Sequence, residues 1–289
     1  MQEISNIIEK YKEVDLTKEL SSKEGLKKFS TIFYADVAEI YDAITRIRNI
    51  ERNPTGFSLN DAAILGLLVR IWKLLKEVVA YYKAENGQII SHFDRQIVEA
   101  AITASYLLIK NDDRTIEDYR KCSYKNRLAA LEEADTKAFY ATPAGLRLIS
   151  SIRVKMAAEG LDLTSFEEQK KHNWKLEGKP FDKIFKQIEP DEFYKLMYGM
   201  PSESLHGSWN ESLDFDLIKN EDGTYSTYPF YQPGDVRFIT PILRITNDPY
   251  LLWLERIECK SEYIEKIFRW MENINKRLFI AFEETYDLR

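Results

Sequence analysis

The chain has 289 residues, of which 44% are hydrophobic and 13% aromatic, so it can bury a large core and is not intrinsically disordered. There are only 11 glycines and 9 prolines. That is well below the usual share of about 12%, which argues against sandwiches, barrels and other folds with many tight turns. The net charge of −6 lacks the basic character expected of a protein that binds duplex DNA.

Cysteine usage and apolar stretches predict a cytoplasmic protein that spans no membrane. Cys122 and Cys259 are far apart and have no companion ligands, so we expect no disulfide framework, no zinc site and no cofactor. The N-terminal residues lack the pattern of a signal peptide. The apolar stretch 62–82 is interrupted by charged residues after Val69, which favours a helix of a soluble bundle over a membrane span.

Long helices are expected in the first part of the chain, where apolar residues recur at helical spacing. Ser21 and Glu24 have the spacing of a capping box, which predicts the start of a helix that runs to about Ile50. Ser58 and Asp61 form a second helix-start signal. The expected helices here cover residues 3–13, 21–50, 58–85 and 89–110.

The rest of the chain is expected to be less regular. Thr142-Pro143 is typical of a helix start, and Pro201 is expected to end a helix. Residues 213–217 alternate apolar and acidic side chains before a turn signal at 220–223, which predicts a β-hairpin. Asn247-Asp248-Pro249 is expected to cap a last helix or helix pair. The expected helices cover residues 114–137, 142–158, 190–201 and 247–286, with short helices and loops at 161–189.

These elements predict an all-α fold, mostly a helical bundle, with a small β-hairpin or irregular excursion near residues 212–240. No repeat or low-complexity linker is visible. We therefore expect N-terminal helices at 1–57 and a bundle core at 58–289 with the hairpin insertion at about 208–246, all within one compact domain.

The first candidate site is a charged stripe on an otherwise apolar helix. His92, Arg95, Glu99 and Thr103 follow the spacing i, i+3, i+7 and i+11, which places them on one helix face. One interpretation is structural: Arg95 and Glu99 pair between helices or face solvent. The other is a polar pocket lined by the same two residues, since charges on apolar helices also occur at functional sites.

The second candidate site is the segment 202–209. Glu203 and His206 would share a helix turn, but no second Glu-x-x-His pair exists for a di-iron site and no ligand spacing indicates zinc. The context of a nucleophilic serine is absent as well. The open alternatives are a histidine held in place at a helix–loop junction and a metal-free polar site that uses His206 as acid, base or ligand donor.

Two further groups of polar residues are interpreted first as structural features. Asp118-Tyr119-Arg120 with Ser123 is read first as a polar helix face. Lys170-Lys171-His172 with Trp174 is read first as a solvated loop, with contact to a phosphate backbone as the alternative.

Three motifs occur in a fixed order. They are Arg95-x-x-x-Glu99, Tyr119-Arg120-x-x-Ser123 and Tyr198-x-x-x-Ser202-x-x-x-His206-Gly207-Ser208. Over roughly residues 60–285 the ordered set resembles the bacterial proteins of domain-of-unknown-function family 5677, which are all-helical and have no settled activity. The resemblance implies that the matching residues gather in one pocket: Arg95, Glu99, Tyr119, Ser202 and His206.

A more distant likeness is to the HEPN superfamily, helical bundles that often act as dimeric ribonucleases in toxin and antiphage systems. Its signature, an arginine followed by a histidine after four to six residues, is absent before all three histidines. A ribonuclease would have to bring Arg95 and His206 together from different helices. The histidine would then move the proton while the arginine stabilises the phosphorane charge.

Two functional hypotheses follow. The first is an interaction, regulatory or ligand-binding component of a bacterial defence or toxin–antitoxin system, with a protein or RNA partner and with a homodimer allowed. The second is a metal-independent, HEPN-like ribonuclease with His206 as acid and base, Arg95 as phosphate binder and Glu99 as the residue that orients one of them. The ligand-binding candidates in either case are Tyr119, Ser202, Glu203 and Ser208.

Overall fold

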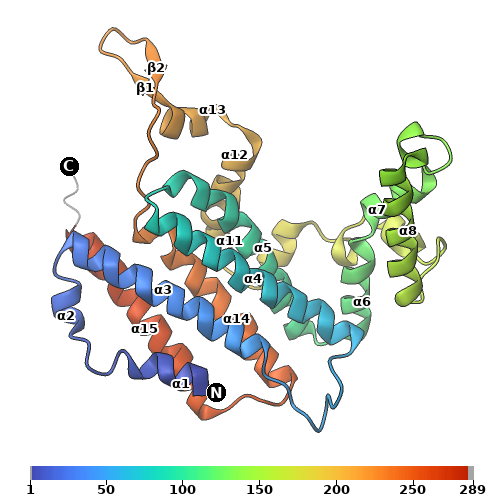
Figure 1. The fold of residues 1–289 in the computed structure, drawn as a ribbon, viewed down its shortest axis with the longest axis horizontal. Coiled ribbons are helices and arrows are strands. Elements are labelled where there is room, and N and C mark those ends of the chain that lie inside the picture. Colours follow the sequence, from blue (N-terminus) through green and yellow to red (C-terminus); the bar gives the residue numbers. More distant parts are fainter. Residues whose placement is uncertain (1, 286–289) are drawn as a thin grey trace.

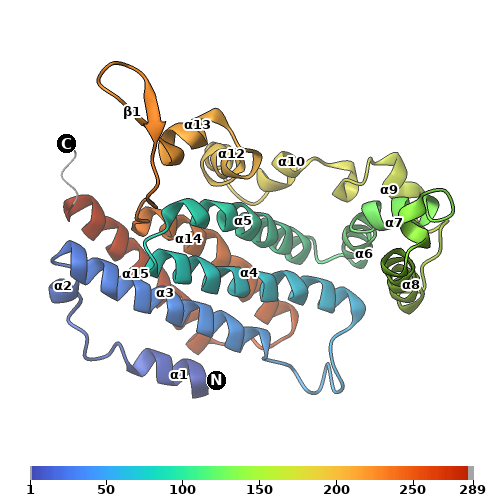
Figure 2. The same cartoon turned by 45° about the horizontal axis from the view of Figure 1, so that its top comes forward.

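A computed structural model describes residues 2–285 of the chain. Long helices lie side by side in the main body, and short N-terminal helices pack against them (Figure 1; Figure 2). The expected all-α fold class is confirmed. The main-body elements are α1 (Gln2–Glu9), α2 (Leu16–Glu19), α3 (Lys23–Thr45), α4 (Leu59–Lys83), α5 (Gly87–Lys110), α14 (Thr240–Arg256) and α15 (Glu262–Thr285).

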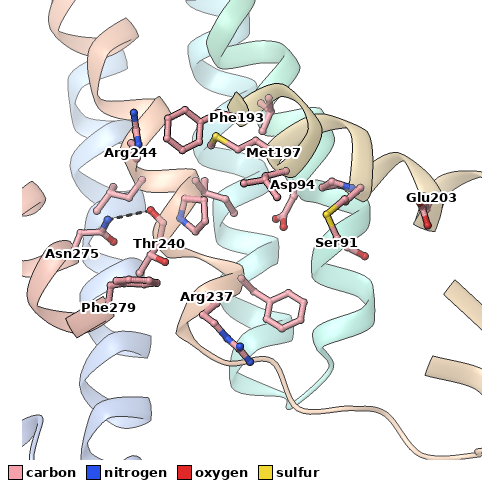
Figure 3. Close-up of a pocket in the computed structure, with 18 of the residues that line it drawn as sticks. Ser91, Asp94, Phe193, Met197, Glu203, Arg237, Thr240, Arg244, Asn275 and Phe279 are labelled. Carbon is pink, nitrogen blue, oxygen red and sulfur yellow. Dashed lines mark hydrogen bonds between the residues drawn. The ribbon is translucent and has the colours of Figure 1, made fainter. Parts of the chain in front are cut away.

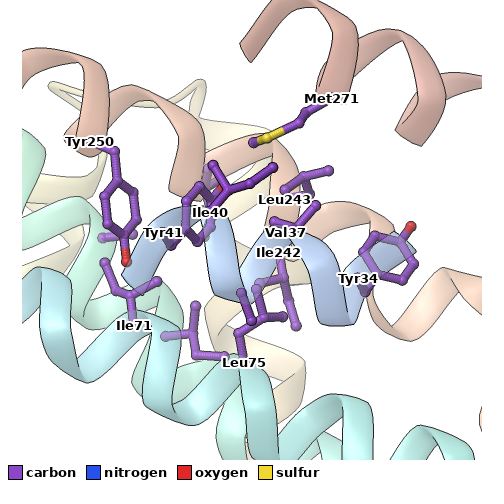
Figure 4. Packing of buried hydrophobic residues seen from close by; sticks show 14 of the residues in the cluster. Tyr34, Val37, Ile40, Tyr41, Ile71, Leu75, Ile242, Leu243, Tyr250 and Met271 are labelled. Carbon is purple, nitrogen blue, oxygen red and sulfur yellow. The ribbon is translucent and has the colours of Figure 1, made fainter. Parts of the chain in front are cut away.

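The core of the main body lies between these helices. Helix α4 packs against α3 and α5, and α14 packs against α5 and α15. Val37, Ile71, Leu75, Leu243 and Met271 are each at most 1% exposed in this core (Figure 4). Each helix turns an apolar stripe inward, and burial of these stripes stabilises the fold by about 25 cal/mol for each Å² of apolar surface.

A pair of tyrosines fixes α14 against its neighbours. The rings of Tyr41 on α3 and Tyr250 on α14 stack with centroids 4.0 Å apart, and both are fully buried. The Tyr41 hydroxyl donates to Asn247 Oδ1 at 2.6 Å, and the Tyr250 hydroxyl donates to the Leu68 carbonyl at 2.7 Å. Burial raises the pKa of both phenols, so the two hydroxyls remain protonated donors.

The segment after α5 forms a side lobe at one end of the main body (Figure 1). Its small core consists of Tyr124, Leu128, Ile152, Met156 and Phe166, which form a cluster separate from the main core. The lobe contains α6 (Asp113–Cys122), α7 (Lys125–Glu132), the 3-10 helix η1 (Ala138–Ala141), α8 (Pro143–Ala158), α9 (Glu167–Lys171) and the 3-10 turn η2 (Leu176–Gly178).

The chain then returns along α5 before it enters α14 (Figure 2). A β-hairpin projects from this returning segment, with Leu217 opposite Thr227, as expected from the sequence. The segment contains α10 (Phe181–Phe185), α11 (Asp191–Tyr194), the π-helix η3 (Lys195–Gly199), α12 (Met200–His206), α13 (Trp209–Glu211), the π-helix η4 (Ser212–Asp216), β1 (Leu217–Lys219), β2 (Tyr225–Thr227) and the 3-10 turn η5 (Val236–Phe238).

The helix-start signals are mostly confirmed. Ser58 and Thr142 each accept a hydrogen bond from a backbone N–H of the following turn. The expected capping box is wrong by one residue, because Ser22 caps α3 while the Ser21 hydroxyl donates to the Lys18 carbonyl. The expected helix 114–137 is divided between α6 and α7, where Tyr124 enters the core of the side lobe.

Both prolines that were expected at helix ends lie inside helical segments. The backbone stays helical from α11 through η3 into α12, and the Met200 N–H donates to the Lys195 carbonyl five residues back. This wider turn gives room for the ring of Pro201, which clashes with the preceding turn of a regular α-helix. Pro249 lies in the interior of α14, so Asn247 is a buried partner of Tyr41 and not a helix cap.

The strand expected from residue 213 is also shorter than the alternation indicates. Residues 212–216 form the π-helix η4, and β1 starts at Leu217. Asp214 and Phe215 line a cavity of the main body. The alternation of apolar and acidic residues therefore did not indicate the two faces of a strand here.

No helix within residues 2–285 combines the length and the apolar character needed to cross a membrane. The division of the chain at residue 57 stays a prediction. Side chains from both sides of that position, such as Phe33 and Leu68, belong to the same core cluster.

Candidate functional site

Arg95 on α5 reaches across to α12. Its Nη1 atom lies 3.3 Å from Nε2 of His206, and its Nη2 atom donates to the Tyr198 hydroxyl at 2.9 Å. The guanidinium carbon is also 4.6 Å from the centre of the Tyr198 ring, within the range of a cation–π contact. The two candidate residues that sequence reasoning placed on different helices are thus in direct contact.

An aromatic cluster supports this contact. Tyr198 lies 4.6 Å from Phe181 and 5.3 Å from Tyr194, measured between ring centres, and Phe185 contacts both Phe181 and Tyr194. The rings hold the phenol that Arg95 binds, so the guanidinium has a fixed position. The pKa of Tyr194 is raised mainly by burial.

His206 is the last residue of α12 and is exposed. Gly207, which follows it, has φ +61°, a left-handed conformation that favours glycine at a helix end. When Arg95 donates to Nε2, the imidazole is neutral and carries its proton on Nδ1. In that state Arg95 and His206 offer a cation and a base side by side, a combination that can bind an anion and accept a proton.

Two of the other predicted residues lie further along α5 and on α6. Glu99 is exposed and has no hydrogen bond or ion pair within residues 2–285. Burial raises the pKa of Tyr119 on α6; Arg70 opposes the rise and the charge of Glu99 adds to it. Glu99 therefore contributes to the raised pKa of Tyr119. It lies one helical turn after Arg95 on α5.

Three polar residues around α12 are used in local hydrogen bonds. The Ser202 hydroxyl donates to the Tyr198 carbonyl at 2.6 Å. Ser208 caps α13 by accepting from the Glu211 N–H at 3.1 Å, and its hydroxyl contacts Glu203 at 3.4 Å. These bonds stabilise the ends of α12 and α13, and the ligand-binding role of the three residues stays a prediction.

The two further groups of polar residues lie in the side lobe. Asp118 accepts hydrogen bonds from Gln169 Nε2 at 2.8 Å and from the Glu177 N–H at 2.6 Å, which ties α6 to α9 and to η2. The Nζ atom of Lys170 lies 3.6 Å from Oε1 of Glu132 and 3.6 Å from Oε1 of Glu167. These contacts support the structural reading of both groups.

A cavity of about 810 Å³ lies on the other side of the contact between α5 and α12 (Figure 3). Helices α5, α12, α14 and α15 and the π-helices η3 and η4 supply most of its walls, and α11, α13 and η5 add the rest. The walls are mainly apolar and include Phe193, Met197, Leu243 and Phe279. Arg95 and His206 are not among the residues that line it.

Asp94 is the acidic residue of α5 that points into this cavity, which Ser91 of the same helix also lines (Figure 3). Its Oδ1 atom is buried and has no hydrogen-bond partner among the described residues. Burial raises the pKa of this carboxyl well above its ordinary value. A buried polar atom without a partner is uncommon in folded proteins and calls for an explanation.

The two arginines of the cavity wall have acidic partners outside it. The Nη2 atom of Arg244 lies 3.4 Å from Oε2 of Glu189, and the Nη2 atom of Arg237 lies 2.6 Å from Oδ2 of Asp235. The amide of Asn275 donates to the Thr240 carbonyl at 3.1 Å (Figure 3). None of these pairs involves Asp94.

A model of the family of unknown function DUF5677 matches residues 61–225, more than half of the chain. The chain belongs to this family. No curated protein and no solved structure shows significant similarity to the chain. The DUF5677 region contains Asp94, Arg95, Tyr198 and His206, so it holds the whole Arg95 contact and one wall of the cavity. Helices α14 and α15, which complete the cavity, lie beyond it.

Asp94 was not among the residues predicted from the sequence, although its spacing with two apolar residues of α5 was a signal. Asp94 is four residues after Ile90 and four residues before Val98, so it interrupts an apolar stripe of α5. Arg95, in contrast, lies on the neighbouring stripe of polar residues. An isolated carboxyl between apolar neighbours at helical spacing marks Asp94 as unusual, although it does not distinguish a cavity from solvent.

Proposed function

We propose that the protein binds a small organic molecule in the cavity between α5, α12, α14 and α15. The observation that carries this proposal is the buried, unpartnered Oδ1 atom of Asp94 within that cavity. A mainly apolar cavity of about 810 Å³ with a few polar groups has the usual size and character of a ligand site.

The position of α12 connects this site with a regulatory role. Met200 and Glu203 of α12 line the cavity, whereas Tyr198 and His206 face Arg95. A ligand that contacts α12 stabilises it against α5 and so changes the exposed surface around His206. This is how an interaction or regulatory component would report ligand binding to a protein or RNA partner.

Binding is tested by native mass spectrometry of the purified protein and by thermal shift against a library of small molecules. We expect a compound that raises the melting temperature of the wild type. Met197→Trp, which puts a larger side chain into the cavity, should abolish the shift. Leu205→Trp is the matched control, because Leu205 is exposed on α12 and does not line the cavity. Failure of every compound, or equal binding by Met197→Trp, would contradict the proposal.

A second candidate function is a metal-independent ribonuclease of the HEPN-like kind. The 3.3 Å contact between Arg95 and His206 favours it, since the two groups are close enough to act on one phosphate. In this role His206 transfers the proton and Arg95 binds the phosphate. Glu99, the residue expected to orient one of them, contacts neither in the described residues and would have to reach them when RNA binds. Such an activity suits a cytoplasmic effector of a bacterial defence or toxin–antitoxin system.

Cleavage of labelled RNA in the presence of EDTA tests the second candidate. We expect His206→Ala and Arg95→Ala each to lower the rate by about 10²–10⁴-fold. The matched control is His92→Ala, since His92 lies on the same face of α5 and its ring contacts the Gln88 carbonyl. Unchanged cleavage by His206→Ala, or no cleavage by the wild type, rules this function out. Cell toxicity on expression gives an independent readout of the same variants.

A further inference from the structure

The cavity has a definite chemical preference, and the inference about it rests on the proposed ligand-binding function. We infer that its ligand is an amphipathic organic cation, whose protonated amine pairs with the carboxylate of Asp94 while its hydrocarbon part lies along the apolar walls.

The first support comes from Asp94 itself. Its Oδ1 atom is buried at the cavity wall and lacks any hydrogen-bond donor among the described residues. A carboxylate in such a place needs a donor, and an ammonium group brings three of them together with a compensating charge. An anionic ligand would meet repulsion at the same point.

The second support is the charge of the cavity wall. Acidic residues other than Asp94 line it, namely Glu203, Glu211, Asp214 and Glu272. Of the basic residues in the wall, Arg237 and Arg244 pair with Asp235 and Glu189, which are not part of the wall. With Asp94, the wall has five acidic residues against three basic ones, the third being Lys276. Its net charge is therefore negative, which favours a cationic ligand.

The third support is the aromatic and apolar character of the cavity walls. Phe193, Phe238 and Phe279 give aromatic surface for a hydrocarbon chain or ring, and aromatic faces also attract organic cations. Phe193 already carries such a contact, with the guanidinium carbon of Arg244 4.0 Å from its ring centre. Residues 2–285 contain no cluster of three or more acidic, histidine or cysteine side chains that could hold a metal ion. The apolar and aromatic lining therefore favours an organic cation over an inorganic one.

Isothermal titration with three probes of one skeleton tests the inference: 4-phenylbutylamine, 4-phenylbutanol and 4-phenylbutyrate at pH 7.5. We expect the amine to bind the wild type most tightly and the carboxylate to bind least. Asp94→Asn should weaken the amine by about tenfold or more and leave the alcohol within about twofold. Glu133→Gln, which removes an exposed carboxyl of the side lobe, should bind all three probes like the wild type.

The outcomes separate the two proposals. If the alcohol binds as well as the amine, or if Asp94→Asn does not weaken the amine, the cavity is a ligand site but the cation assignment is wrong. If none of the probes binds and no library compound shifts the melting temperature, both proposals fail. The ranking of the three probes on the wild type decides the matter even if Asp94→Asn does not fold.

Discussion

Asp94 and Arg95 are adjacent in the sequence of α5 but serve opposite sides of its contact with α12. Asp94 points into the cavity, and Arg95 binds Tyr198 and His206 outside it. Consecutive residues of a helix are about 100° apart around its axis, so one peptide bond is enough to direct two charges into different surroundings. The charges can therefore be changed independently.

Replacing Asp94 by asparagine should stabilise the ligand-free protein at neutral pH. Burial raises the pKa of this carboxyl in the folded state, so the folded protein holds the proton more tightly than the unfolded chain. Stability therefore falls as pH rises from about 4 through the folded-state pKa, and the asparagine variant lacks this loss. We expect the melting temperature of Asp94→Asn to exceed that of the wild type by about 2–6 °C at pH 7.5.

The pH dependence of that difference is the control. Near pH 4 the carboxyl is protonated in both states, so the two melting temperatures should converge when measured by circular dichroism. A variant that is less stable than the wild type at pH 7.5 would show that Asp94 has a stabilising partner in the folded protein.

Replacing Arg95 should cost stability even with a conservative substitution. Lysine keeps the charge but cannot reach Tyr198 and His206 at once with a planar group. We expect Arg95→Lys to lower the free energy of unfolding by about 1–2 kcal/mol and Tyr198→Phe, which keeps the ring, by about 1 kcal/mol. Urea denaturation measures both. Equal stability of all three proteins would mean that the contact does not persist in solution.

The buried tyrosine pair gives a sharper test of the fold. Tyr41→Phe leaves Asn247 Oδ1 without its donor inside the core, so the free energy of unfolding should fall by about 1–3 kcal/mol. Tyr263→Phe is the matched control, because its hydroxyl bonds Ser5 at the surface and its loss should change stability by less than about 0.5 kcal/mol. Similar losses in both variants would contradict the buried arrangement around α14.

Glu177 in the side lobe should make stability sensitive to acid. Burial opposes its ionisation, but hydrogen bonds from Lys179, Tyr106 and Thr115 outweigh this and lower its pKa to about 2. The stabilisation is therefore complete above about pH 4.5, the ordinary value, and is lost as pH falls toward 2. We expect Glu177→Gln to melt a few degrees below the wild type at pH 7, with the gap closing between pH 5 and 2.

Sequence reasoning predicted the elements whose signals are local. Ser58 and Thr142 bond the next turn of backbone, so their role depends only on nearby residues. Pro201 and Pro249 were misread because the surrounding structure accommodates them, the first through a π-helical turn and the second within the packed helix α14. Local propensity gives no information about such accommodation.

The candidate site, like the fold, could be predicted from the sequence only in part. Arg95 and His206 stood out as candidate charged and titratable residues, yet they are 111 positions apart and their spacing carries no signal that they meet. Asp94 was hidden because a single acidic residue has the same appearance in a sequence whether it faces solvent or a cavity. Only the packing of α14 and α15, which come more than 140 residues later, makes it a buried carboxyl.

The π-helix η3 limits which deletions and substitutions this segment can tolerate. Its wide turn holds an additional residue and still brings the chain back to about the same helix face. Deleting one residue between positions 195 and 199 would therefore restore a regular helix and leave His206 on the side of α12 that faces Arg95. The same deletion would remove the room that the wide turn gives to the ring of Pro201. A shorter turn is thus expected to be tolerated only together with a substitution of Pro201.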